Sequence, residues 1–416
     1  MRIAIVCNDT RGGVQPYVAL ALGLRAAGHD VRAVAPGGLR GMFTEVGISV
    51  TPLSGDVQAV LRNAGGAAER GALASLALAA RHLPRVMETW MRETLAGCDG
   101  ADVIAGGIGG MATGLGVAEA LGVPFVEAHL QPVGAPTDAY PGVLTPWLPA
   151  WAGGGARRLS HLLSEAALWS SMAGPVRRAR RRVLGLERAP RAHLDQPVLY
   201  GFSPEVVRVP ASGPRPRHTT GYWTLPLDPH WSPPAELAAF LAADGPPVVA
   251  IGFGSMTSEE PAALAALVRG AARSAGVRAV LLSGWGGLTE GPADEAVFTI
   301  DAVPHEWLFP RVAAIVHHGG AGTTGASLRA GVPVTVVPFT MDQPFWAARV
   351  AALGAGPAPI PRRRLTRERL AAALRRSIDD GAMRACAAVL GERIRAEDGV
   401  GEAVRRFGER ERPQAS

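Results

Sequence analysis

The residues best suited to bind a ligand form one glycine-rich string, His-His-Gly-Gly-Ala-Gly-Thr-Thr at 317–324. An apolar run at 312–316 precedes the string and predicts a short buried strand. A run of small residues at 325–330 follows it and predicts the start of a helix, which Gly331 closes. The string is therefore expected between the end of a strand and the start of a helix.

A glycine-rich loop in that place presents unpaired backbone N–H groups at the positive end of a helix dipole, where an anion binds well. The hydroxyl groups of Thr323 and Thr324 and the ring of His318 add side-chain donors. Together these groups predict a diphosphate site. An ordinary βα turn contains the same glycines, so the loop alone does not distinguish the two.

Alternating strands and helices surround the string and must position it. Predicted strands lie at 2–6, 30–35, 102–105, 124–128, 247–253, 279–282 and 334–337, and predicted helices at 17–27, 56–100, 111–121 and 365–408. The pattern restarts after a proline-rich linker at about 208–234, so two doubly wound α/β domains are expected. A second glycine cluster at 106–110 suits a ligand contact or a tight turn.

Composition sets broad limits on the function. The chain has 416 residues, enough for two domains, and a net charge of 42 − 36 = +6, carried by arginine because lysine is absent. This modest charge and the lack of a recognisable motif argue against a nucleic-acid partner. Three scattered cysteines argue against a disulfide framework. No apolar run is long enough to cross a bilayer and no leader precedes the first strand, so a cytoplasmic protein is expected.

The glycine-rich string continues into Pro338-Phe339 and then into Asp342-Gln343-Pro344-Phe345-Trp346. This combination resembles the donor-binding signature of the inverting, nucleotide-sugar-dependent glycosyltransferases of family 1, which have the GT-B fold. Segments along most of the chain resemble the same family, among them 252–256 and 283–288. The most similar branch contains the sterol glucosyltransferases and the actinobacterial enzymes that glycosylate antibiotics.

The resemblance implies two facing Rossmann-like domains with a cleft between them. Residues 1–220 would bind the acceptor and residues 221–416 the nucleotide sugar, with the last helix packed back on the first domain. The implied reaction moves a sugar, with inversion, from a UDP- or dTDP-linked donor to a hydroxyl group of an apolar acceptor such as a macrolide, polyketide, sterol or terpenoid. No cofactor and no metal are expected, and the chain has no Asp-x-Asp pair to hold a divalent ion.

By the same resemblance, the nucleotide sugar would contact residues of several segments. These residues are Ser255, His318, Gly320, Gly322, Thr323 and Thr324 for the phosphates, Val303 and Trp307 for the pyrimidine base, Trp285 beside the nucleotide, and Asp342 and Gln343 for the sugar hydroxyl groups. Trp285 also suits core packing, and Asp342 and Gln343 also suit a polar turn before a helix. Many relatives bind the ribose with a glutamate where this chain has Ala326.

The sequence departs from the family at the catalytic base. The resemblance places a His or Asp base at the position of Gly13, and glycine cannot accept the proton that an attacking hydroxyl group loses. Asp9 lies four residues earlier and is one replacement, although it also suits a cap or turn. His129 and Asp138, which follow the strand at 124–128, are the others. A more acidic acceptor or an inactive protein would also account for the glycine.

A segment rich in proline and tryptophan at 131–172 suits an apolar acceptor pocket, with a helical hairpin packed on its own domain as the alternative. The expected acceptor contacts are Gln131, Tyr140, Trp147 and Trp169. An arginine run at 176–183 predicts a solvated helix face or a weak contact with an anionic membrane surface. Two other functions stay open: a non-catalytic partner that binds sugar nucleotides, and a nucleotide-sugar epimerase of the same fold.

Overall fold

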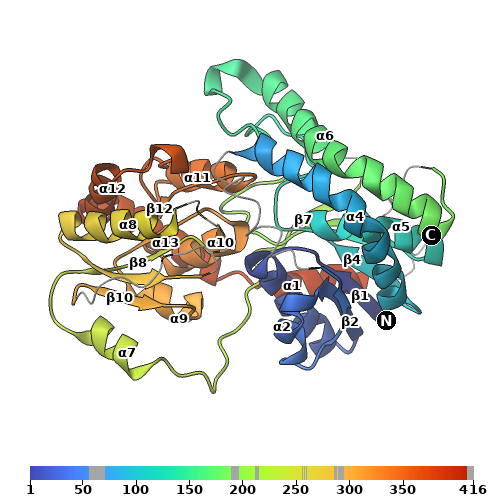
Figure 1. Cartoon of the computed structure of the whole chain (residues 1–416), viewed down its shortest axis with the longest axis horizontal. Helices are drawn as coiled ribbons and strands as arrows, with labels where there is room; N and C mark the ends of the chain where they lie inside the picture. The colour runs from blue at the N-terminus through green and yellow to red at the C-terminus, as the bar shows by residue number, and fades with distance from the viewer. Residues whose placement is uncertain are drawn as a thin grey trace. The chain divides into compact units, whose positions relative to one another are not determined.

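The chain forms two α/β units (Figure 1). The computed structural model describes residues 1–55, 71–188, 196–210, 215–254, 256, 258, 260–284, 288 and 295–409. The first unit contains the described residues up to Leu225, except 71–75, and also 397–409. The second unit contains the described residues from Pro226 to Ala396, with which 71–75 are grouped.

In the first unit, parallel strands form a sheet in the order β3-β2-β1-β4-β5-β6-β7. The strands are β1 (Arg2–Val6), β2 (Asp30–Pro36), β3 (Ser49–Leu53), β4 (Val103–Gly106), β5 (Phe125–His129), β6 (Val198–Tyr200) and β7 (Arg217–Thr219). The helices are α1 (Arg11–Ala26), α2 (Gly41–Thr44), α4 (Ala72–Cys98), α5 (Ile108–Leu121), α6 (Gly153–Ala179) and α14 (Gly399–Gly408). β4 and β5 are buried along their whole length, as expected for parallel strands covered on both faces.

In the second unit, parallel strands form a sheet in the order β10-β9-β8-β11-β12. The strands are β8 (Val248–Gly252), β9 (Arg278–Leu282), β10 (Val297–Ile300), β11 (Ala314–His317) and β12 (Val334–Val336). The helices are α7 (Ala235–Ala242), α8 (Pro261–Ala275), α9 (His305–Leu308), α10 (Ala321–Ala330), α11 (Gln343–Ala352), α12 (Arg367–Asp379) and α13 (Gly381–Arg395).

The alternation of side chains along β8 divides the core of the second unit into two layers. Val249 and Ile251 pack in one hydrophobic cluster with residues of α8 and α12. Val248 and Ala250 pack in another, with residues of α7 and α9. Because successive side chains of a strand point to opposite faces, the sheet is covered by helices on both sides.

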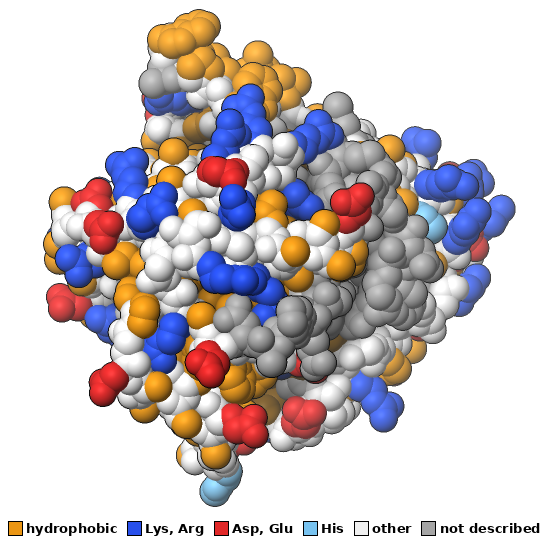
Figure 2. Space-filling model, turned by 60° about the vertical axis from the view of Figure 1, so that its left-hand side comes forward, with side chains coloured by type: hydrophobic (Ala, Val, Ile, Leu, Met, Phe, Trp, Pro, Cys, Tyr) orange, Lys and Arg blue, Asp and Glu red, His pale blue; other side chains and the backbone are white. Residues whose placement is uncertain are grey.

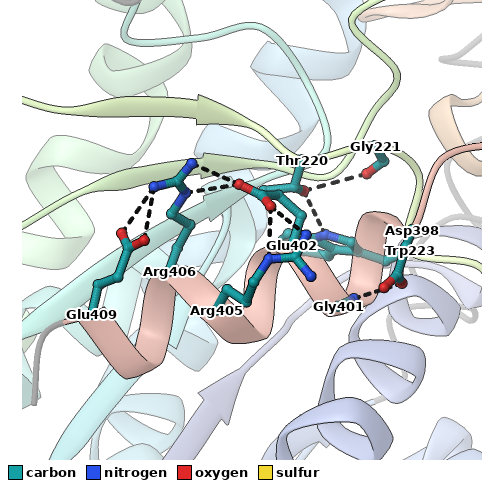
Figure 3. Close-up of polar contacts among 9 residues, drawn as sticks. All are labelled: Thr220, Gly221, Trp223, Asp398, Gly401, Glu402, Arg405, Arg406 and Glu409. Atoms are coloured by element: carbon teal, nitrogen blue, oxygen red, sulfur yellow. Dashed lines mark hydrogen bonds and ion pairs between the residues drawn. The ribbon is translucent and has the colours of Figure 1, made fainter.

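The last helix, α14, belongs to the first unit, where it packs on α1. A side-chain carbon on Gly23 of α1 would overlap Val400, which shows how closely the two helices approach. Asp398 caps α14 by accepting the N–H of Gly401 at 2.9 Å. Glu402, on the same helix, pairs with Arg405 and Arg406 (Figure 3). Capping and ion pairs along this short helix support its packed face.

Most predicted strands lie within one or two residues of the observed ones, but several helix boundaries were wrong. α1 begins at Arg11, six residues before the expected start, even though Pro16 lies inside it. Burial of Val14, Tyr17 and Val18 against the sheet outweighs the poor helix propensity of the segment. α10 likewise begins at Ala321 rather than at residue 325.

The segment at 131–172 was expected to contact the acceptor or to form a helical hairpin, and its second half is a single long helix, α6. Its residues 169, 172 and 176 pack against the core of the first unit, and this packing stabilises the helix. The predicted helix at 56–100 corresponds to α4 over the part that is described. None of the helices in the described part of the chain combines the length and apolarity needed to cross a bilayer.

Candidate functional site

The carboxyl ends of β8 and β11 lie side by side at the middle of the second sheet. β9 and β10 extend the sheet on one side of β8, and β11 and β12 extend it on the other. The strand order therefore reverses between β8 and β11, and such a switch point opens a crevice for ligands outside the strand ends. Gly254 follows β8 at this point, and His318 follows β11.

The helix after β11 begins directly at this switch point. Gly320 is the N-cap of α10, and the N–H of Thr324 donates to its carbonyl at 2.8 Å. The N–H groups of residues 321–323 therefore have no carbonyl partner within the helix. No side chain caps the helix, and all three residues are partly exposed. These amides lie at the helix start where the sequence predicted a diphosphate site, four residues earlier than expected, and unpaired amides in this position suit an anion.

A buried chain of hydrogen bonds holds the loop against the helix. The N–H of Gly319 donates to Nδ1 of His317 at 2.8 Å, so that nitrogen carries no proton. Burial lowers the pKa of His317 well below its usual value, so the ring is neutral and its proton is on Nε2. Nε2–H donates to Oγ of Ser327 at 3.0 Å, and the Ser327 hydroxyl donates to the carbonyl of Thr324 at 2.9 Å. The chain ties the end of β11 to the first turns of α10, and no motif in the sequence indicates it.

We expect Ser327→Ala to lower the free energy of unfolding by about 1–3 kcal/mol, because the buried Nε2–H of His317 then has no acceptor. Urea unfolding at pH 7 measures the loss. Ser170→Ala, on the exposed part of α6, is the matched control and should change stability by less than about 0.5 kcal/mol. Equal losses in the two variants would show that the chain does not stabilise the site.

His318 lies beside the free end of α10. A Cβ on Gly254 would lie 2.9 Å from Cε1 of the ring, and one on Gly320 would lie 2.6 Å from Nε2, so glycine at both positions leaves room for it. His318 is 8% exposed, and its Nδ1 has no hydrogen-bond partner within the described residues. Burial, reinforced by His305, lowers the pKa of His318 to about 4, so the ring is neutral at pH 7. A buried ring nitrogen without a partner suits a ligand that supplies one.

The predicted phosphate contacts differ in accessibility. Gly320, Gly322 and Thr323 are partly exposed at the start of α10. Thr324 is fully buried, and its hydroxyl oxygen has no partner within the described residues. The Thr324 side chain therefore lies inside the unit rather than on the surface that a diphosphate would reach first. Ser255 and Trp285 lie outside the described residues.

Asp342 and Gln343 lie at the start of α11. The side-chain amide of Gln343 already forms hydrogen bonds within the second unit. Its amide oxygen accepts the N–H of Phe339 at 2.8 Å, and its amide nitrogen points to the sulfur of Met256 at 3.1 Å. Asp342 is partly exposed, and its Oδ2 accepts the indole N–H of Trp346 at 3.0 Å. A carboxylate can accept several donors, so Asp342 is the better placed of the two to bind a sugar hydroxyl group.

Met341, directly before Asp342, has a backbone φ of +56° and is the only non-glycine residue with positive φ in the described part of the chain. A left-handed backbone costs a side-chain-bearing residue roughly 1–2 kcal/mol. Strain of this kind concentrates at functional sites, where the surrounding structure maintains it. The sequence has no signal for it, since methionine is not a residue expected there.

The two residues expected at the pyrimidine base differ in their surroundings. Val303 is buried in a cluster that includes Leu308, so only its backbone can reach a ligand. Trp307 is partly exposed, and its ring lies 5.4 Å from the ring of Trp231 and 4.8 Å from the guanidinium carbon of Arg311. These neighbours hold the indole in place, so a base would meet a fixed aromatic surface.

The first sheet has a switch point of its own, between β1 and β4. The loop at 7–10 follows β1, and the glycine cluster at 106–110 runs from the last residue of β4 into the first turn of α5. A Cβ on Gly109 or Gly110 would overlap a backbone carbonyl at the end of β1 or just beyond it. The sequence suggested a ligand contact or a tight turn for this cluster, and close packing of the start of α5 on β1 instead accounts for Gly109 and Gly110.

Asp9 lies in the loop after β1, and its carboxylate occupies the space next to Gly13. A Cβ on Gly13, in the first turn of α1, would overlap the carboxylate carbon and both oxygens of Asp9. Asp9 is partly exposed, and the N–H of Thr10 donates to its Oδ1 at 2.6 Å. The N-cap of α1 is Thr10, without a side-chain cap. The carboxylate of Asp9 thus occupies the space that a side chain at position 13 would fill.

His129, the second candidate base, belongs to a buried ion-pair cluster. Burial alone would raise the pKa of Glu127, but the hydrogen bond from His129 and the charge of Arg215 outweigh it and lower the pKa to about 2. Glu127 is therefore ionised, and Nε2–H of His129 donates to it at 2.8 Å while Arg215 pairs with it at 2.7 Å. His129 is 1% exposed, too little for an acceptor to reach. Asp138, the third candidate, is exposed in the loop before α6.

The four predicted acceptor contacts do not lie in a common environment. Gln131, just after β5, is partly exposed. Tyr140 is buried against the ring of His161, and Trp169 packs against the core of the first unit. Trp147 is 74% exposed. Gln131 is thus the only one of the four that combines partial exposure with a place at a strand end.

Sequence comparisons find relatives of the chain, and one family model covers the segment that contains α10. Residues 290–409 match the family model of the erythromycin biosynthesis protein CIII-like C-terminal domain. The sterol 3-beta-glucosyltransferase of Cryptococcus neoformans is 34% identical over 433 residues, which cover 97% of this chain and 27% of that protein. The chain spans about 27–30% of the length of the curated relatives it matches.

Solved structures share the fold over almost the whole chain. The glycosyltransferase SsfS6 of Streptomyces sp. SF2575, complexed with thymidine diphosphate, is 22% identical with a TM-score of 0.65, and the match covers 98% of this chain and 99% of that one. The spinosyn rhamnosyltransferase SpnG complexed with spinosyn aglycone is 20% identical with a TM-score of 0.64 and coverage of 98% and 100%. The fold is that of the GT-B glycosyltransferases, and the resemblance seen in the motifs is confirmed.

Proposed function

We propose that this chain transfers a sugar, with inversion, from a UDP- or dTDP-linked donor to a hydroxyl group of an apolar small molecule. The observation that carries the proposal is the end of α10 at the second switch point. There, the free amides of residues 321–323 lie next to His318, whose buried Nδ1 has no partner in the described structure. This is the chemistry of a diphosphate site, and it lies within the segment that matches the family model.

The second unit binds the nucleotide sugar in this proposal, and the first unit binds the acceptor. Cleavage of the bond between the anomeric carbon and the diphosphate leaves negative charge on the departing nucleoside diphosphate. The amides of α10 and the neutral ring of His318 stabilise that charge as hydrogen-bond donors that are positioned before the reaction. The carboxylate of Asp342 accepts a hydrogen bond from a hydroxyl group of the sugar. No metal ion takes part in the proposed reaction.

Asp9 removes the proton in this proposal. The acceptor oxygen forms a bond to the anomeric carbon on the face opposite the diphosphate, and its proton passes to the carboxylate of Asp9. Asp9 is preferred over His129 because its carboxylate is partly exposed and lies at the switch point of the first sheet, whereas the His129 ring is buried. Its carboxylate also takes the space beside Gly13, where the family pattern has its base.

The names of the matched proteins support the choice of substrates. One relative is a sterol glucosyltransferase, and one solved structure holds thymidine diphosphate and another a spinosyn aglycone. These argue for a pyrimidine nucleoside diphosphate on the donor and for an apolar polycyclic or macrocyclic acceptor.

The test is a transfer assay with the purified chain. UDP-glucose and several dTDP-deoxysugars are each combined with a panel of sterols, macrolide aglycones and aromatic polyketides, and products are detected by mass. The expected result is a product heavier than its acceptor by one sugar residue for at least one pair. Nucleotide binding without any transfer would favour a non-catalytic partner, and conversion of the donor without an acceptor would favour an epimerase.

A further inference from the structure

Helix α6 turns its polar side inward at its start. Ser160, His161 and Ser164 are buried and bond to the preceding loop. Oγ of Ser160 accepts the N–H of Gly142 at 2.9 Å, Oγ of Ser164 accepts that of Leu144 at 3.3 Å, and Nε2 of His161 lies 2.9 Å from the carbonyl oxygen of Tyr140. An amphipathic surface helix of a globular protein normally buries its apolar side instead.

The opposite side of the same turns is apolar and exposed. Leu159, Leu162 and Leu163 are each more than half exposed, and they recur at the spacing of one helix face. Trp147 and Trp151, in the segment just before α6, are 74% and 88% exposed. In Figure 2, hydrophobic side chains gather at the top of the view, at the height where α6 begins in Figure 1. We call these five residues the α6 patch. Apolar surface concentrated in this way marks a binding surface.

Arginines lie on the turns that carry the α6 patch, and one exposed carboxylate, that of Asp138, lies beside Gly154 at the start of the helix. Residues 139–164 contain no aspartate or glutamate, and they contain Arg157 and Arg158. Arg158 is exposed next to Leu159. Further along the same helix and its extension, Arg177, Arg178, Arg181 and Arg182 are exposed as well. Arginines outnumber carboxylates beside the patch, which favours a partner that combines apolar surface with negative charge.

We propose that the α6 patch docks the protein on an anionic lipid bilayer surface. Tryptophan rings prefer the interface between headgroups and acyl chains, and leucine side chains on one helix face enter the same layer. Arginines at the edge of the patch contact lipid phosphates and neutralise them. An anionic bilayer provides apolar acyl chains and negatively charged headgroups in one surface. The proposal is independent of the proposed reaction, since binding to lipid needs neither donor nor acceptor.

The test uses the full chain and flotation with vesicles of phosphatidylcholine alone or mixed with an equal amount of phosphatidylglycerol. The expected result is stronger binding to the anionic vesicles, which falls as salt is raised. Trp147→Ser combined with Trp151→Ser should weaken that binding at least about tenfold, as should Leu159→Gln combined with Leu162→Gln and Leu163→Gln. Arg158→Gln should weaken binding about fivefold and only to the anionic vesicles.

The matched control is Leu227→Gln combined with Val389→Gln, which changes exposed apolar residues outside the patch and should leave binding unchanged. The five substitutions in the patch are on exposed side chains, so circular dichroism and thermal unfolding should match the wild type. Absence of binding to anionic vesicles, or equal binding to the two kinds of vesicle, would overturn the proposal. So would a wild-type dimer in light scattering that the leucine variant converts to a monomer, because the patch would then be an interface between copies.

Discussion

Replacing Asp9 by asparagine is expected to lower kcat about 100-fold or more, with little change in KM for the nucleotide sugar. Asparagine keeps the size of the side chain and its contact with position 13, but it cannot accept the proton of the acceptor hydroxyl group. Positioned general bases contribute about 10²–10⁴-fold to such reactions. The measurement is the initial rate with saturating donor and with the best acceptor from the transfer assay.

Exchanging the two residues gives a sharper test. Gly13→Asp alone should not raise turnover above that of the wild type, since the new side chain would overlap the carboxylate of Asp9. Gly13→Asp combined with Asp9→Gly removes the overlap and restores a carboxylate to the same space, so it should recover part of the lost rate. Unchanged turnover in Asp9→Asn would exclude Asp9 as the base. A loss found only in His129→Gln or Asp138→Asn would assign the base to that residue.

Replacing His318 by alanine is expected to lower kcat/KM about 10²–10³-fold, the usual effect of removing one donor that stabilises developing charge. It should also weaken the binding of the nucleoside diphosphate product, which titration calorimetry measures directly. Because the pKa of His318 is about 4, the ring stays neutral between pH 6 and 8, and the loss should be the same across that range.

Two controls accompany the His318 variant. His230→Ala changes an exposed histidine of the same unit and should leave both quantities unchanged. His318→Gln keeps an amide donor near the same place and should retain more activity than alanine. Full activity in His318→Ala, or a loss that grows steeply as the pH falls from 8 to 6, would contradict a neutral donor at this position.

The sequence predicted the part of the fold that depends on hydrophobic runs. The runs that became β1, β8 and β11 are short, apolar and bounded by glycine or polar residues, so their place in parallel sheets could be inferred before the structure. The proposed diphosphate site followed from the glycines after β11, because a strand end and a helix start leave amides unpaired. These features are local in sequence.

Features that depend on contacts across the fold could not be predicted. The hydrogen-bond chain from His317 joins residues ten positions apart, and nothing in their types reveals it. The contact between Asp9 and Gly13 needs the early start of α1, which burial of its apolar face produces against the propensity of its glycines and proline. The exposure of single side chains could not be predicted either. Thr324, an expected phosphate contact, is buried, and Trp147, an expected acceptor contact, is exposed.

The return of α14 to the first unit means that this unit is not encoded by one continuous stretch of the chain. A gene fragment that stops at Leu225 would leave the α14-covered side of α1 bare, including the groove at Gly23 that holds Val400. Exchanging the second unit between homologous proteins therefore requires two junctions, one before Pro226 and one after Ala396, so that α14 stays with its native helix α1.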